Sequence, residues 1–258
     1  MLVNAKNGIS SCEVSRALGV TKKTAWFMLH RLRLSLQNHS FEKLSGEVEV
    51  DETYVGGQAR KTNSKQKRNR TRGGGSVGKA VVMGLLERDG RVMAMSIPNP
   101  KRKTLAALVH KYVEPGSAVY TDALPSYNKL NSHFAHEAIN HAVCYVKENV
   151  HTNGLENFWS LLKRTIRGTY VSVEPFHLFR YLDEQAFRFN ERKNTDSGRF
   201  LIGIVGVIGK RLKYVKLISE ASSHELPTTG AWQAYDPATK RHMKRKPFGG
   251  MGWSALPA

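Results

Sequence analysis

The chain has 258 residues, 40% of them hydrophobic, which is long enough to bury the core of one ordinary domain with appendages. It carries 40 Lys and Arg against 21 Asp and Glu, and a net charge of +19 attracts polyanions, of which nucleic acid is the expected partner. Its 2 cysteines are too few for a disulfide framework, and no apolar run approaches the roughly 18 residues of a membrane span. We therefore expect a cytoplasmic protein with no membrane partner.

Residues 8–37 have the pattern of two short helices broken at Gly19, with Thr21 as the cap of the second. The apolar positions at helical spacing are Val14, Ala17 and Leu18, then Ala25, Met28, Leu29 and Leu32. We predict a helix-turn-helix-like segment over residues 1–40, whose second helix would present its first turn to DNA. That turn holds Lys22, Lys23 and Thr24. The alternative is a plain helical hairpin that belongs to the core.

The next segment has the pattern of strands. VEVDETYVG, KAVVMGLLERDG and RVMAMSIP are apolar or alternating runs, and Asp89-Gly90 is a strong hairpin signal, so three strands should form an antiparallel meander. The basic, glycine-rich residues 58–78 between the first two runs cannot pack in a core. This loop is either a solvated insertion or an arm that binds phosphates. Its cations include Arg60, Lys61, Lys65, Lys67, Arg68, Arg70 and Arg72.

The remaining elements alternate between helix and strand. KTLAALVHKYV indicates a helix, SAVYTD a strand, ALPSYNKL the start of a helix and HEAIN a short strand, and two long helices follow in LENFWSLLKRTIRG and PFHLFRYLDEQAFRFNER. This order favours one α/β domain over residues 44–218, a mixed sheet flanked by helices. Residues 219–258 are polar and basic, and we expect them to form a weakly ordered tail.

Acidic side chains gather on the first strand. Because side chains alternate along a strand, Glu47, Glu49 and Asp51 share one face. Glu52 lies on the other, so Asp51 and Glu52 cannot both serve one site. Asp51 follows apolar Val50 at the centre of the run, and it is the candidate to point into a cleft.

Two further acids can join Asp51. Asp122 ends the strand SAVYTD, and ligands collect at the carboxyl ends of strands in open α/β sheets. Glu156 lies near the start of a helix whose buried stripe should be Leu155, Phe158, Trp159, Leu162 and Ile166. A second stripe of that helix holds Glu156, Ser160, Lys163 and Arg167, so its cations, with Arg164, could reach the phosphates of DNA. Arg188, Asn190 and Arg192 in the last helix either contact phosphate or form a solvated face.

These three acids suit one chemistry. Mg²⁺ prefers oxygen ligands, and a pair of ions held by carboxylates can activate a water or a 3′-hydroxyl for displacement at phosphorus. Without metal, three carboxylates in one cleft would repel one another. Each acid alone could instead be a surface or capping residue. Together, in so basic a chain, they favour metal-dependent phosphoryl transfer.

Long blocks of the sequence resemble a known family. NAKNGISSCEVSRALGVTKKTAWFMLHRLR, EVEVDETYVGG, VYTDALPSYNKL, HTNGLENFWSLLKRTIRGTY and HLFRYLDEQAFRFNERKNTD, with GKRLKYVKLI, together resemble the bacterial insertion-sequence transposases of family fifteen-ninety-five, the ISXO-like group of the DDE superfamily. The resemblance runs in order over roughly residues 3–218. It implies an RNase H-like core that cuts and joins element-end DNA with Mg²⁺ or Mn²⁺, two ions per site.

The resemblance also implies roles for residues and partners. Asp51 corresponds to the first acid, Asp122 to the second, Glu156 to the third and Lys163 to the basic residue two turns later. Some family members carry Asn at the third acid, so Asn153 is a weaker candidate for the same cleft. The implied partners are double-stranded DNA, both element ends and target, and further copies of the chain on that DNA. The implied location is the bacterial cytoplasm, at the nucleoid.

The sequence departs from the family pattern at both ends. Family members usually begin with a zinc ribbon built on paired cysteines, and this sequence starts at the segment that follows it. Residues after about 220 match no part of the family pattern. An alternative to an active transposase is therefore a catalytically inactive remnant that only binds DNA, and a third hypothesis is a nuclease of the same fold that cuts branched DNA without joining it.

Overall fold

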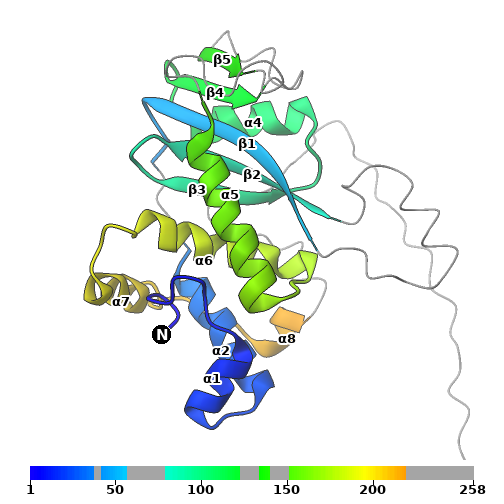
Figure 1. Ribbon diagram of the computed structural model, residues 1–258, viewed down its shortest axis with the longest axis vertical. Coiled ribbons are helices and arrows are strands. Elements are labelled where there is room, and N and C mark those ends of the chain that lie inside the picture. Colours follow the sequence, from blue (N-terminus) through cyan, green and yellow to red (C-terminus); the bar gives the residue numbers. More distant parts are fainter. Residues whose placement is uncertain (38–41, 57–78, 123–133, 140–150, 219–258) are drawn as a thin grey trace, which may run out of the picture.

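The computed structural model describes residues 1–37, 42–56, 79–122, 134–139 and 151–218. Their centre is a sheet in the order β3-β2-β1-β4-β5 (Figure 1). The strands are β1 Glu47–Val55, β2 Ala80–Glu87, β3 Val92–Ile97, β4 Ala118–Asp122 and β5 Ala135–Ile139. The first three form the antiparallel meander, whereas β4 runs parallel to β1 and β5 parallel to β4. This mixed order confirms the predicted RNase H-like sheet flanked by helices.

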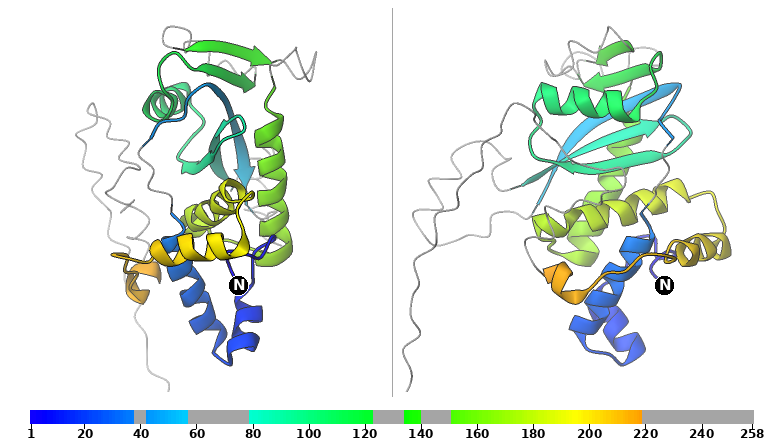
Figure 2. Two further views of the ribbon diagram at one scale, coloured as in Figure 1. Left: turned by 90° about the vertical axis from the view of Figure 1, so that its left-hand side faces the viewer. Right: turned by 180° about the vertical axis from the view of Figure 1, so that it is seen from behind.

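Helices cover both faces of the sheet. The helices of the described residues are α1 Ser11–Leu18, α2 Lys22–Ser35, α4 Arg102–Tyr112, α5 Asn153–Thr165 with its π-helical extension η3 Ile166–Tyr170, the short η4 Pro175–His177, α6 Leu178–Asn190, α7 Asp196–Val205 and α8 Tyr214–Ile218, of which α4, α5 and α6 pack on the sheet. Figure 2 shows α4 on one side of the sheet and α5 on the other. None of the helices in the described ranges is long and apolar enough to cross a membrane.

The alternation of side chains along β1 separates two apolar cores. Val48 and Val50 point to the α4 side and pack with Leu105 and Val109 of that helix. The opposite side packs against α5 and α6, through the side chains Leu155, Phe158, Trp159, Leu162, Leu178 and Leu182. The predicted buried stripe of α5 is therefore confirmed. Because Glu49 and Asp51 also face α5, the acids lie on the side where the long helix crosses the sheet.

The two N-terminal helices form as predicted. The Ser10 side chain accepts from the Glu13 backbone N–H at 3.1 Å, the Thr21 side chain accepts from the Thr24 N–H at 3.1 Å, and Gly19 has the left-handed φ of 65° that ends α1. The apolar stripes are only partly buried.

The buried members of those stripes are Val14, Ala25 and Leu29, whereas Ala17, Leu18, Met28 and Leu32 are exposed. The reason is that α1 lies at the far end of the molecule from the sheet (Figure 1).

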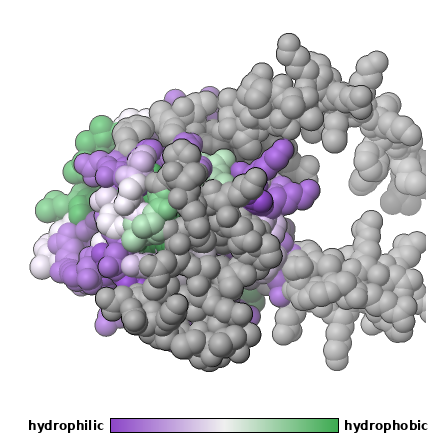
Figure 3. All heavy atoms as spheres, turned by 90° about the horizontal axis from the view of Figure 1, so that it is seen from above, coloured by the Kyte–Doolittle hydropathy of each residue, from purple (hydrophilic) through white to green (hydrophobic). Residues whose placement is uncertain are grey.

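The sequence interpretation did not include α7 and α8. A capping Thr195, whose side chain accepts from the Gly198 N–H at 3.1 Å, begins α7. No residue of α7 is buried. Figure 3, which views the molecule from above, shows hydrophobic surface at the left edge, the side on which α7 lies in Figure 1. The predicted helix start at 123–130, the basic loop 58–78 and the tail 219–258 lie outside the described residues.

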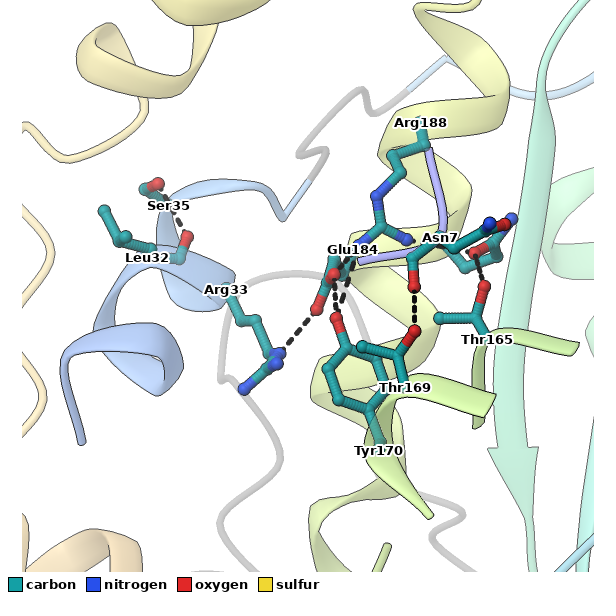
Figure 4. Close-up of polar contacts among 10 residues, drawn as sticks. Asn7, Leu32, Arg33, Ser35, Thr165, Thr169, Tyr170, Glu184 and Arg188 are labelled. Carbon is teal, nitrogen blue, oxygen red and sulfur yellow. Dashed lines mark hydrogen bonds and ion pairs between the residues drawn. The ribbon is translucent and has the colours of Figure 1, made fainter. Parts of the chain in front are cut away.

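One buried carboxylate ties α2 to α6 and η3 (Figure 4). Arg33 on α2 donates from Nε to Glu184 Oε2 on α6 at 2.6 Å, and both side chains are 1% exposed. The Tyr170 hydroxyl at the end of η3 donates to Glu184 Oε1 at 2.5 Å, and Arg188 pairs with the same oxygen. Since a buried charge must be paired, these groups fix α2, η3 and α6 in one arrangement.

Beside this carboxylate lies a buried histidine. His30 has no exposed surface, and the rings of Trp26, His177 and Tyr181 surround it. Neither ring nitrogen of His30 has a hydrogen-bond partner within the described part of the chain. Burial, followed by the charge of nearby Arg33, lowers the pKa of His30 to about 2. Burial likewise lowers the pKa of His177 to about 4, and it raises that of Asp183 to about 6.

Replacement of His30 by Leu should make the fold less sensitive to acid. Because the His30 pKa falls from 6.5 in the unfolded chain to about 2 in the fold, the unfolded chain binds one more proton as pH falls below 6.5. For each pH unit below 6.5, the free energy of unfolding therefore decreases by about 1.4 kcal/mol because of His30. Between pH 8 and pH 5, the free energy of unfolding of His30→Leu should fall by about 2 kcal/mol less than that of the wild type.

Urea denaturation at the two pH values measures this difference. Burial raises the pKa of Asp183, so the folded chain binds a proton there more tightly than the unfolded chain does. The stability that this proton contributes is lost as pH rises from 3.8 to about 6. Asp183 and His177 are present in both proteins, and their contributions cancel in the comparison. Equal decreases of stability in the two proteins would contradict a neutral, buried His30.

Candidate active site

The sheet brings the positions of Asp51 and Asp122 together. β1 and β4 are parallel, and their last pair in register is Val50 with Thr121. The next positions along the two strands are Asp51 and Asp122, which therefore lie side by side on strands about 4.8 Å apart. On its other side Asp51 pairs with Gly84 of β2. The side chain of Asp122 is not among those described.

Asp51 is held in place by N–H donors. Its Oδ1 accepts from the backbone N–H of Glu52 at 2.8 Å, and its Oδ2 accepts from the indole N–H of Trp159 at 2.9 Å. Trp159 lies on α5 and is 4% exposed. Its ring occupies the space over Gly84, where an added Cβ would lie 2.6 Å from Trp159 Cζ2. The glycine thus lets the indole lie close enough to the sheet to reach Asp51.

A second carboxylate fixes the beginning of α5. Glu49, two residues before Asp51, is 1% exposed, and its Oε2 accepts from the backbone N–H of Leu155 at 3.0 Å. Such an acceptor satisfies one of the free N–H groups in the first turn of the helix and favours its positive end. Gly154 permits this approach, since a Cβ there would lie 2.8 Å from Glu49 Oε2. The strand therefore caps the helix that crosses it.

Arg88 neutralises the acids at the start of β1. It donates to Glu47 Oε2 at 2.5 Å, to Glu49 Oε1 at 3.4 Å and to the backbone carbonyl of His151 at 3.1 Å. The three acids on this face thus have different surroundings. Glu47 and Glu49 pair with a cation, whereas Asp51 is held by the two N–H donors just described.

Glu156 lies one helical turn from the residue that contacts Asp51. It is exposed in the first turn of α5, three positions before Trp159, a separation of about 5 Å along the helix surface. Asn153, at the first position of α5, is also exposed. No three His, Cys, Asp or Glu side chains gather as a metal site among the described residues, which leave out the Asp122 side chain. The metal role of Asp51, Asp122 and Glu156 stays a prediction.

The predicted DNA-binding residues lie on three separate segments. On α5 and η3, Arg164 and Arg167 are exposed and Lys163 is half-buried. On α2, the exposed first turn presents Lys22, Lys23 and Thr24, and the Lys23 ammonium lies 4.8 Å from the centre of the Tyr214 ring. The third segment, Arg60 to Arg72, lies outside the described residues. The structure describes two exposed basic surfaces, one on α5 with η3 and one on α2.

Two of the three residues weighed as phosphate contacts, Arg188 and Asn190, instead support the fold, whereas Arg192 is exposed. Arg188 pairs with Glu184 in the interior. Asn190 accepts from the Val92 N–H at 2.7 Å and donates to its carbonyl at 3.1 Å, so it joins α6 to the edge strand β3. Arg192 donates to the Phe189 carbonyl at 2.8 Å. Arg188 and Asn190 are therefore not part of a solvated face.

Sequence reasoning gave no role to Glu49 and placed Trp159 only in the core. A signal for Glu49 was present, because it shares a face with Asp51. Glu49 caps a helix at Leu155, which lies 106 residues later in the chain. This contact depends on how the strand and the helix cross, and no local sequence pattern records such a crossing. For Trp159 the useful signal is the indole N–H itself, because a buried indole usually finds an acceptor.

Comparisons of the sequence with known proteins identify a transposase family. The family model described as "ISXO2-like transposase domain" matches residues 43–190. A Haemophilus influenzae protein described as an "uncharacterized transposase-like protein" is 35% identical over 101 residues, which cover 39% of this chain and 81% of that protein. Among solved structures, the crystal structure of the Mos1 strand transfer complex is 10% identical and covers 82% of this chain and 77% of that one, with a TM-score of 0.25. The fold assignment rests on the strand order.

Gly84→Ala should show how tightly Trp159 is held. The added methyl group would overlap the indole, so we expect a decrease of about 1–3 kcal/mol in the free energy of unfolding. Gly168→Ala is the matched control, because a Cβ at that position meets nothing within 4 Å. The control should leave stability unchanged or raise it by up to about 1 kcal/mol, because alanine favours helical backbone more than glycine does. Urea denaturation with a common m-value measures both, and equal stabilities would contradict the close packing of Trp159 on the sheet.

Proposed function

The chain belongs to the family of ISXO2-like transposase domains, and we propose that it cleaves and joins the ends of an insertion sequence by metal-dependent phosphoryl transfer. In this proposal Asp51, Asp122 and Glu156 hold the divalent ions. The supporting observation is the parallel register of β1 and β4, which sets the positions of Asp51 and Asp122 side by side at the place where α5 crosses the sheet.

The chemistry of the donor set fits Mg²⁺ or Mn²⁺. All three acids offer carboxylate oxygens, which are the ligands that hard divalent cations prefer. The Asp51 carboxylate accepts the N–H groups of Glu52 and Trp159, and an ionised carboxylate offers about four lone-pair sites in all, so that N–H donors and a cation can share one such group. Two such ions, when bound, would activate the attacking oxygen and stabilise the leaving one.

The chain's own residues would hold those acids and the DNA. The indole of Trp159 orients Asp51, and the Glu49 carboxylate keeps the first turn of α5, with Glu156, at the sheet. One and two turns beyond Ser160, Lys163 and Arg167 would contact backbone phosphates on either side of the scissile bond. A water and then the freed 3′-hydroxyl would be the successive nucleophiles.

Double-stranded DNA is the proposed partner. The exposed Lys22, Lys23 and Thr24 begin α2 in a helix pair with capped ends and a left-handed glycine between them. Such a first turn can enter the major groove, while the net charge of +19 attracts the phosphates at long range. The buried Arg33 and Glu184 would transmit the position of this helix pair to α6 and η3.

The decisive experiment is strand cleavage and joining on labelled duplexes that carry the element's own ends. We expect products with Mg²⁺ or Mn²⁺ and none with EDTA. Asp51→Asn, Asp122→Asn and Glu156→Gln should each reduce them below about 1% of wild type, because removal of several kcal/mol of transition-state stabilisation corresponds to at least about 100-fold. Glu114→Gln, which changes an exposed acid outside the proposed site, is the control.

The outcomes separate the competing hypotheses. Normal strand joining by Asp122→Asn would contradict the proposed role of that acid. Binding of element ends without products, unaffected by metal, would mean that the chain is an inactive remnant. Cleavage of branched DNA without joining would indicate a nuclease.

The basic loop has a separate test. If the seven Lys and Arg between Arg60 and Arg72 bind phosphates, replacing them all with Ser should flatten the dependence of log affinity on log salt concentration. The expected change in slope is about 0.9 for each phosphate that the variant no longer binds. Fluorescence anisotropy with one duplex at several salt concentrations measures this slope. An unchanged slope would show that the loop does not touch DNA in the complex.

A further inference from the structure

Helix α7 and the turn after it carry an exposed apolar surface. Residues 200–209, FLIGIVGVIG, contain no charged side chain, although the chain as a whole carries 40 Lys and Arg. Every large side chain in this run is exposed, with Leu201 at 60% and Ile208 at 78%. We call this the α7 surface. Its members are Phe200, Leu201, Ile202, Ile204, Val205, Val207 and Ile208.

The helix packs on the protein through its glycines. A Cβ at Gly203 would lie 3.2 Å from Val3 Cγ1, and one at Gly206 would collide with the backbone carbonyl of Ser35. Leu201 and Val205 recur at a spacing of four, with Ile204 beside them, and they occupy the opposite side of the helix. The small side thus faces α2, and the large apolar side faces outward.

The extent of this surface distinguishes it from ordinary exposed side chains. Scattered apolar residues, such as Leu18 and Leu32, need no special explanation. Large apolar side chains gathered in one short run expose an area on the order of several hundred Å², the size of a functional patch. A standard interface buries about 800 Å² on each partner. The α7 surface is therefore large enough to form the centre of one.

We propose that the α7 surface is the interface between two copies of this chain. A two-fold axis brings the same patch of both copies together, so an uncharged apolar surface is complementary to itself. Copies that each carry +19 repel one another at long range, and the interface that joins them should contain no charge. The α7 surface meets this requirement.

The cations that flank the surface make an acidic partner a poorer match. Arg199 pairs with Asp196 and donates to the carbonyls of Glu191 and Asn194. At the other end, Lys210 Nζ donates to the carbonyls of Leu34 at 3.0 Å and of Ser35 at 3.4 Å. Both cations are thus bound within the chain itself, whereas a surface that captures acids would present them to the partner.

This interface does not depend on the proposed chemistry. Figure 1 shows α7 beside α2 and α6, while α5 begins at the other end of the molecule, near β4. Two copies joined through α7 would keep the candidate active sites uncovered. Oligomeric state and DNA cleavage can therefore fail independently in experiments.

The test is the molar mass of the full chain in solution, by sedimentation velocity and light scattering, after removal of nucleic acid. Salt of about 0.5 M screens the repulsion between copies. We expect a concentration-dependent dimer. Leu201→Asp and Ile204→Asp should weaken it at least about 100-fold, because each places a charge in an apolar interface. Leu18→Asp is the matched control, since Leu18 is an exposed leucine on α1, and it should dimerise like the wild type.

Disulfide cross-linking is a second measurement, and it tests the interface without placing a charge in it. In a chain with Cys12→Ser and Cys144→Ser, Ile204→Cys should form a disulfide-linked dimer under mild oxidation, and Leu18→Cys should not. Circular dichroism checks that the variants fold. A wild type that remains monomeric at all concentrations would overturn the proposal, as would Asp variants that dimerise normally or equal cross-linking at both positions.

Discussion

The contact on which the site depends is the buried carboxylate of Glu49 at the first turn of α5. A strand and a helix separated by 106 residues meet there through one charge-assisted hydrogen bond. Without it, the beginning of α5 would leave a buried N–H unpaired, and Arg88 would keep only one of its two acidic partners. The bond sets how far along the sheet the helix begins, and therefore where Glu156 lies relative to Asp51.

The same constraint explains why a basic chain gathers acids on one strand. Because side chains alternate along β1, the three acids at every second position point to the same face of the sheet. The helix that crosses this face gives each of them different surroundings. Glu47 pairs with Arg88 at the exposed end, Glu49 is buried as a cap, and Asp51 meets the indole of Trp159. Glu47 and Glu49 thus support the fold, and Asp51 is the acid of this strand that the proposed function assigns to the divalent ions.

The sequence predicted most elements because their signals are local. The cap at Thr21, the Asp89-Gly90 hairpin and the apolar stripe of α5 each depend on neighbours within a few residues. That Asp51 and Asp122 could meet was predicted from the strand order, whereas the direct pairing of β1 with β4 was not. The close approach at Gly84 and the Glu49 cap could not be predicted, because each depends on two distant segments. The exposed side of α7 could not be predicted either, since an apolar run normally indicates core.

The exposed basic side chains and the exposed apolar side chains lie on different elements of this molecule. The two kinds of surface also attract partners over different distances. Electrostatic attraction acts over a Debye length of about 8 Å or more, so Lys22 and Arg167 can guide a phosphate backbone before contact. Apolar attraction acts only on contact, and the uncharged α7 surface can select a partner only after the two surfaces meet. In the proposed roles, contact with DNA and contact with another copy of the chain belong to different elements, so that the two kinds of surface do not interfere. The buried Glu184, with Arg33 and Tyr170, connects the two basic elements α2 and η3 to α6, the helix that precedes α7 in the chain.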